Sequence, residues 1–123
     1  MSDRTGPIAG AIEALLRRRF PVPDERPDVL VGLIGRGIEL SRTPAMHERE
    51  AARLGLSCAY VLIDFDAMAL VDADLDAALR AAAGMGFHGV NVTYPFKQTV
   101  MPLLDEVSAE ALTIGAVNTV VFG

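Results

Sequence analysis

The chain has 123 residues, a hydrophobic share of 51% and a formal net charge of −5 at pH 7. This length fits one domain with a substantial core, and it is short for two. The acidic balance argues against nucleic-acid binding, which requires a positive surface to displace counterions from phosphate. Because no run of about 18 apolar residues is present, we expect no membrane-spanning helix. The single cysteine, Cys58, cannot form an internal disulfide, and no signal-peptide pattern is visible, so we expect a cytoplasmic protein.

The N-terminal segment has helical periodicity. Its apolar residues recur at spacings near 3.6, which predicts an amphipathic helix over residues 7–19: Ile8, Ile12, Leu15, Leu16 and Phe20. A proline-rich stretch over residues 20–27 then interrupts the helix. We therefore treat residues 1–28 as an N-terminal helix with a connector, and residues 29–123 as the folded domain.

Alternating strand and helix signals follow. The apolar run 29–34 is typical of a strand buried on both faces of a parallel sheet, and residues 58–64 predict a second strand. Between them, Thr43 as N-cap and Pro44 as the first helical residue indicate a helix that continues to about residue 54. Another helix is expected over residues 72–85. The fold class we predict is a three-layer α/β/α domain with a mostly parallel, mixed sheet built from βα units.

Two glycine clusters suggest dinucleotide binding without meeting its requirements. Gly35-Arg36-Gly37 follows a predicted strand, but the third glycine of the fingerprint is replaced by Leu40. Gly84-Met-Gly-Phe-His-Gly89 precedes a strand, which is the wrong context for holding pyrophosphate at a helix N-terminus. We therefore expect no cofactor-binding residues in this chain.

The histidines and two of the aspartates are weak candidates for a metal or phospho-acceptor site. His47 and His88 lack the cysteine or carboxylate spacing typical of a metal site and are expected to be structural. Asp64 and Asp66 end a strand and could suggest a metal or phospho-acceptor site, as in response-regulator receiver domains. In those proteins the acidic pair follows the first strand, where this chain has Gly35 and Arg36, so that alternative is disfavoured.

The stretch 86–97 carries the strongest candidate for chemistry. It predicts a short core strand ending near Thr93, then a helix beginning at Pro95, which places Lys97 in the first helical turn. A helix dipole disfavours a cation there, which suits a lysine that transfers protons. The alternative is a solvated surface Lys97, with Asn91 and Thr93 as ordinary polar residues at a strand end. Asn118, in the last predicted strand over residues 117–122, is open to the same choice between a buried structural hydrogen bond and a ligand contact.

Three motifs occur in order along the chain: Leu40-Ser-Arg-Thr-Pro44, Gly89-Val-Asn-Val-Thr-Tyr-Pro-Phe-Lys97 and Gly115-Ala-Val-Asn-Thr119. Together they resemble the substrate-binding domain of the shikimate/quinate dehydrogenase family, over residues 29–122. By this resemblance Ser41 and Thr43 would bind the substrate carboxylate. Ring hydroxyls would be contacted by Asn91, Thr93, Lys97 and Asn118, with Lys97 as the catalytic group. Threonine at position 43, where typical shikimate dehydrogenases have serine, resembles the branch that also oxidises quinate.

The resemblance also implies a reaction. It is the NAD- or NADP-dependent interconversion of shikimate and 3-dehydroshikimate, on the route to aromatic amino acids, or the oxidation of quinate. Because the sequence shows no nucleotide-binding domain before Gly123, we expect the cofactor to be held mainly by a separate domain, and the chain alone to be inactive. The alternative is a stand-alone module that binds hydroxy acids, or regulates, without turnover.

Overall fold

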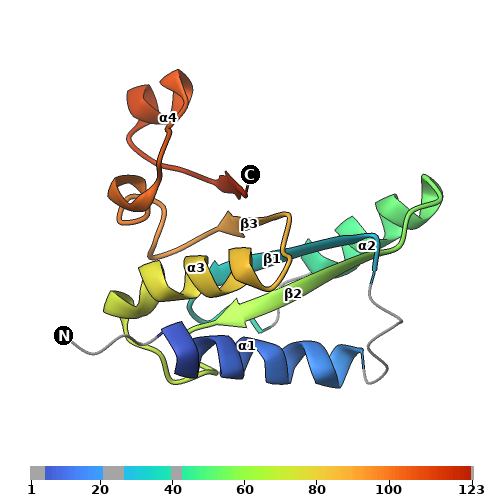
Figure 1. Ribbon diagram of the computed structural model, residues 1–123. Helices are drawn as coiled ribbons and strands as arrows, with labels where there is room; N and C mark the ends of the chain where they lie inside the picture. Colours follow the sequence, from blue (N-terminus) through green and yellow to red (C-terminus); the bar gives the residue numbers. More distant parts are fainter. Residues whose placement is uncertain (1–4, 21–26, 40–42, 123) are drawn as a thin grey trace.

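The computed structural model describes residues 5–20, 27–39 and 43–122. Its strands are β1 (Val29–Gly35), β2 (Cys58–Asp64), β3 (Gly89–Val92) and β4 (Thr119–Val121). They form one sheet in the order β2-β1-β3-β4, with β1 parallel to β2 and β3, and β4 antiparallel to β3 (Figure 1). The first strand is therefore central, and the mixed, mostly parallel sheet predicted from the sequence is confirmed.

Helices cover both faces of the sheet. On one face α1 (Thr5–Arg19) and α3 (Leu75–Gly84), which follows the 3-10 turn η2 (Asp72–Asp74), bury the larger core. On the other face α2 (Thr43–Arg53) packs against β2, where Leu33, Ile38 and Tyr60 form a smaller cluster. The 3-10 turn η3 (Met101–Leu103) and α4 (Ala109–Ile114) complete the chain, and α4 projects from the sheet (Figure 1). This is the expected three-layer arrangement.

Helix α1 belongs to the same core as the βα units. Its Ile8, Ile12 and Leu16 are between 0% and 3% exposed, and the helix packs against α3. At its end, Arg19 forms an ion pair with Glu48 of α2. The helix was predicted from its periodicity, but its placement outside the folded domain was wrong, because its apolar stripe is buried against the sheet layer and not left as an appendage.

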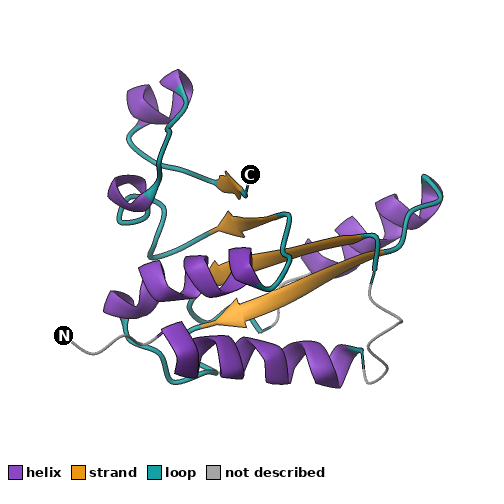
Figure 2. Ribbon diagram, in the orientation of Figure 1, coloured by secondary structure: helices purple, strands orange, loops and turns teal. Residues whose placement is uncertain are grey.

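The segment after β3 differs from the prediction. Residues 93–100 form successive turns and no regular helix, the Tyr94–Pro95 peptide is cis, and Figure 2 draws this segment as a loop. Phe96 is 1% exposed and its ring lies 4.7 Å from that of Phe65. Burial of this side chain draws the turn down onto the core, which outweighs the local preference of proline for a helix start. Lys97 therefore lies in an isolated turn, closed by the Val100 N–H donating to the Phe96 carbonyl oxygen at 2.9 Å, and not in the first turn of a regular helix. The helix-dipole argument for it has no basis.

Candidate functional site

The candidate site lies at one edge of the sheet. The parallel strands β1 and β3 both end there, and the antiparallel β4 begins there, so residues far apart in sequence meet. The backbone N–H of Thr93 donates to the carbonyl oxygen of Ile34 at 3.0 Å, and that of Val92 donates to Asn118 at 2.7 Å. The strand edge thus brings together Asn91, Thr93 and Asn118. Ligands of open α/β sheets bind at such carboxyl ends.

Lys97 is held at the same edge by its backbone. Its carbonyl oxygen accepts from the N–H of Val117 at 2.8 Å, and in the preceding turn the carbonyl of Tyr94 accepts from the N–H of Arg36 at 3.1 Å. The Lys97 side chain is exposed, and within the described residues its amino group has no hydrogen bond or ion pair. It is also the only lysine in the sequence. A solvent-facing amine on a fixed backbone is available to a ligand.

The side chain of Asn91 is fixed by two hydrogen bonds to other strands. Its Nδ2 donates to the hydroxyl oxygen of Tyr60 at 2.6 Å, and its Oδ1 accepts from the hydroxyl of Thr119 at 3.0 Å. Tyr60 lies on β2 and Thr119 on β4, so the amide joins three of the four strands. Sequence reasoning missed both partners. The available signals were a tyrosine inside the apolar run of β2 and a threonine next to Asn118.

The structure treats three other predicted site residues, Asn118, Ser41 and Thr43, less fully or differently from the prediction. Asn118 lies just before β4 and is exposed, so the expectation of a buried amide inside the last strand was wrong. Ser41 lies outside the described residues. Thr43 is the first residue of α2, and its side chain is likewise outside the description. The structure gathers Asn91, Thr93, Lys97 and Asn118 at one edge. The binding and catalytic roles of all six residues remain predictions.

Asp64, at the end of β2, organises the loop after β1. Its carboxylate is 1% exposed and accepts four backbone N–H groups, from Ile38 at 2.8 Å, Asp66 at 2.9 Å, Gly37 at 3.1 Å and Ala67 at 3.4 Å. Burial raises the pKa of this carboxyl, but the backbone hydrogen bonds outweigh burial and lower the pKa below its ordinary value. Asp64 thereby stays ionised and fixes the start of the connection from β1 to α2.

The same contacts bear on cofactor binding. A Gly-rich turn after a first strand binds pyrophosphate through free backbone N–H groups. In this turn the N–H groups of Gly37 and Ile38 already point at the Asp64 carboxylate. Asp64 would have to leave, or an anion would have to lie against it, for the turn to hold a phosphate. As it stands, this turn does not fit the pyrophosphate of a dinucleotide.

Gly35 allows β1 to approach the turn after β3. A Cβ atom built on Gly35 would lie 2.5 Å from Cγ2 of Thr93 and 3.0 Å from the carbonyl oxygen of Tyr94. These separations are shorter than van der Waals contact, so any other residue would push the two segments apart. The glycine that resembled part of a nucleotide fingerprint serves instead to bring the candidate site close to β1.

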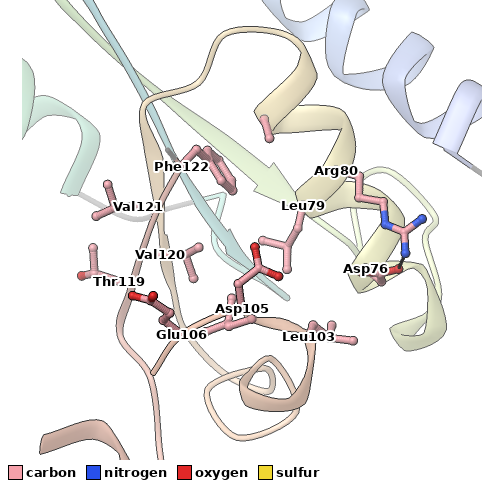
Figure 3. Close-up of a pocket in the computed structure, with 12 residues that line it drawn as sticks. Asp76, Leu79, Arg80, Leu103, Asp105, Glu106, Thr119, Val120, Val121 and Phe122 are labelled. Atoms are coloured by element: carbon pink, nitrogen blue, oxygen red, sulfur yellow. Dashed lines mark ion pairs between the residues drawn. The ribbon is translucent and has the colours of Figure 1, made fainter. Parts of the chain in front are cut away.

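A groove of about 810 Å³ lies on the β4 side of this site, between α3, the segment after η3, and β4, and Thr119 is among the residues that line it (Figure 3). Among its charged side chains, Asp76 and Arg80 form an ion pair at 2.8 Å on the α3 wall, while Asp105 and Glu106 lie on the wall after η3. None of the six predicted site residues lines it. Its excess of carboxylates disfavours a carboxylate ligand.

Two structural features are not found in the described part of the chain. It contains no group of three or more His, Cys, Asp or Glu side chains arranged to hold a metal ion. Its helices lack the length and apolar character required to cross a bilayer.

Comparison with known proteins assigns the family. The family described as "Shikimate dehydrogenase substrate binding domain" matches residues 33–120. The chain belongs to this family. The "Quinate/shikimate dehydrogenase (NAD(+))" of Corynebacterium glutamicum is 53% identical over 93 residues, which cover 76% of this chain and 33% of that protein. The chain thus spans about a third of the length of the curated relatives it matches.

Solved structures of the family have the same fold. Quinate dehydrogenase from Corynebacterium glutamicum in complex with NAD superimposes with a TM-score of 0.71 at 53% identity, over 76% of this chain and 33% of that one. Shikimate 5-dehydrogenase from Thermus thermophilus, in complex with NADP(H) and shikimate, gives a TM-score of 0.69 at 35% identity, over 77% and 34%. Helix α1 lies before the residues that the shikimate dehydrogenase family matches.

Proposed function

We propose that this chain is the substrate-binding part of a shikimate or quinate/shikimate dehydrogenase. Such an enzyme interconverts shikimate and 3-dehydroshikimate, or oxidises quinate, with NAD or NADP. The observation that carries the proposal is the backbone pairing that gathers Asn91, Thr93, Lys97 and Asn118 at one sheet edge, in a chain of the shikimate dehydrogenase family. The similar proteins named for NAD and for NADP support both cofactors equally.

Different residues would bind different parts of the substrate. Ser41 and Thr43, before and at the start of α2, would bind the carboxylate through hydroxyls and helix N–H groups. Asn91, Thr93 and Asn118 would bind the ring hydroxyls, since amide and hydroxyl groups both donate and accept. The threonine in Ser41-Arg42-Thr43, together with similarity to an enzyme named for both substrates, favours acceptance of quinate as well as shikimate.

Lys97 would move the proton. A nicotinamide held by a separate cofactor domain would supply hydride acceptance or donation at the ring carbon that carries the reacting hydroxyl. As the secondary alcohol becomes a ketone, the neutral Lys97 amine takes the hydroxyl proton, and in the reverse direction the ammonium returns it. Its exposed amino group, without a partner in the described residues, is free to reach such a hydroxyl.

The isolated chain is expected to bind substrate weakly and to transfer no hydride. Hydride transfer requires the donor carbon within about 3.5 Å of the nicotinamide. The one glycine turn that follows a strand in the described residues has its Gly37 and Ile38 N–H groups occupied by Asp64. A separate cofactor-binding domain would therefore hold the dinucleotide and close the site over the substrate.

Titration of the chain with shikimate and with quinate, followed by amide NMR, tests this assignment. We expect dissociation constants in the millimolar range, because an open site contributes only the modest net free energy of wet hydrogen bonds, about 1 kcal/mol each. Shifts should centre on Ser41, Thr43, Asn91, Thr93, Lys97 and Asn118. Asp105 and Glu106 in the groove serve as internal controls. Shifts confined to the groove, or micromolar binding without the second domain, would favour the stand-alone module over the dehydrogenase.

A further inference from the structure

The carboxamide of Asn91 is clamped from both sides of its strand. Thr119, directly opposite on β4, donates its hydroxyl to Oδ1 at 3.0 Å. On the other side Tyr60 reaches from β2 across the intervening β1 and accepts from Nδ2 at 2.6 Å. Two hydrogen bonds on opposite ends of a planar group fix the plane of that group.

Counting donors and acceptors shows what the clamp leaves for a ligand. A primary amide has two N–H groups and an oxygen with two lone pairs. One N–H is used by Tyr60 and one lone pair by Thr119, so one N–H and one lone pair remain. Asn91 is only half-buried, so these remaining groups can face a bound molecule. A donor and an acceptor side by side in one plane match a ring hydroxyl, which also donates and accepts.

Tyr60 is itself fixed by contacts with α2, the helix on the same face of the sheet. Its side chain is 3% exposed, and the ring of His47 in α2 stacks on it with centroids 4.8 Å apart at 18°. The backbone N–H of Tyr60 donates to Glu48 of α2 at 2.9 Å. The tyrosine therefore connects α2, whose first residue is Thr43, to the amide on β3.

We propose that Tyr60 and Thr119 are positioning residues that hold the Asn91 carboxamide in the plane needed to bind a substrate hydroxyl. Tyr60 also fixes the position of this amide relative to α2. The identity of the ligand rests on the proposed function, whereas the clamp is a property of the ligand-free chain. Neither side chain is assigned contact with the substrate. Their effect on binding acts through Asn91.

Conservative variants of the full chain test the clamp. Tyr60→Phe keeps the ring and its stack on His47, and Thr119→Val keeps the shape at the edge strand, so each removes one hydroxyl. Thr119→Ser restores a hydroxyl without the methyl group. Tyr94→Phe, at a 76% exposed tyrosine, and Thr113→Val, at an exposed threonine of α4, are matched controls. The readouts are the side-chain Nδ2 signals of Asn91 without ligand, the shikimate dissociation constant, and the unfolding midpoint.

We expect Tyr60→Phe and Thr119→Val to move the Asn91 side-chain signals and to weaken shikimate binding by roughly 2- to 10-fold each, the range for loss of one hydrogen bond. Thr119→Ser should recover both properties, and the two controls should change neither. Unmoved Asn91 signals in both variants would overturn the clamp. Lower unfolding midpoints with unchanged shikimate affinity would overturn the positioning role, because they indicate structural support alone.

The readouts distinguish a failure of the clamp from a failure of the proposed function. If the unsubstituted chain binds neither shikimate nor quinate, the proposed function fails, and so does the positioning role for that substrate. The Asn91 signals of the ligand-free variants still decide the clamp in that case. Their displacement supports it, and their constancy contradicts it.

Discussion

The backbone carbonyl oxygen of Lys97 accepts a hydrogen bond from the backbone N–H of Val117 at 2.8 Å. This contact ties the turn after β3 to the segment that leads into β4, so the lysine and Asn118 share one edge. The position of the proposed proton-transfer group thus depends on strand pairing. A helix, which the sequence predicted at this point, is not needed to hold it.

Replacing Lys97 by Met should abolish most turnover. The test requires a protein that also carries a cofactor domain. One such protein is a fusion of this chain to the part of the Corynebacterium glutamicum relative that lies beyond the matched residues. Methionine preserves most of the side-chain volume but cannot transfer a proton, so kcat should fall by about 100-fold or more, with a smaller change in KM. Lys97→Arg is the control for charge, since arginine stays protonated at neutral pH. Near-normal kcat in either variant would remove Lys97 from the mechanism.

Asp64→Asn should destabilise the fold in a pH-dependent way. An asparagine amide group cannot accept the N–H bonds that the second carboxylate oxygen accepts, so we expect a loss of about 1 to 3 kcal/mol at pH 7 in urea unfolding. The folded-state pKa of Asp64 lies below its unfolded value. Its contribution is therefore complete above the unfolded pKa, about 3.9, and is lost as the pH falls through the lower folded value.

The difference in unfolding free energy between the wild type and Asp64→Asn should accordingly shrink below about pH 4. Asp76→Asn, at a surface ion pair on α3, is the control and should change stability by less than about 1 kcal/mol. A difference that is constant from pH 7 to pH 3 would show that ionisation of Asp64 is irrelevant.

Gly35→Ala should disturb the candidate site directly. The added Cβ would meet Thr93 and the Tyr94 carbonyl at 2.5 and 3.0 Å, so the turn that carries Lys97 must shift. Overpacking of this kind costs about 1 to 3 kcal/mol and should weaken shikimate binding together with stability. Gly10→Ala in α1 is the matched control. Apart from its chain neighbours and the backbone of its own helix, no described atom lies within 4 Å of its added Cβ. Because alanine favours helix, stability should rise by up to about 1 kcal/mol.

Ile12→Ala tests whether α1 is part of the folded unit. Ile12 is 0% exposed within the core, and its truncation should lower the free energy of unfolding by about 2 to 5 kcal/mol in a single transition. Ile114→Ala, at a 74% exposed isoleucine of α4, should change stability by about 0.5 kcal/mol or less. Equal losses of unfolding free energy in the two variants would show that α1 does not contribute to the stability of the folded domain.

Local sequence determined the elements whose signals lie within a few residues. The apolar run of β1, the 3.6-residue period of α1 and the Thr43-Pro44 start of α2 each correspond to an observed element. The three motifs likewise placed the chain in its family, because they are contiguous strings that can be compared directly.

Only the tertiary structure decided which of these elements meet. The burial of Phe96 against Phe65 replaced a predicted helix with turns, and the burial of Ile12 drew α1 into the core. The clamp on Asn91 depends on Tyr60 and Thr119, which come from strands on either side of β3 and share no sequence pattern with it. Hydrogen bonds and packing between distant segments depend on strand order and register, and neither follows from the propensity of any one segment.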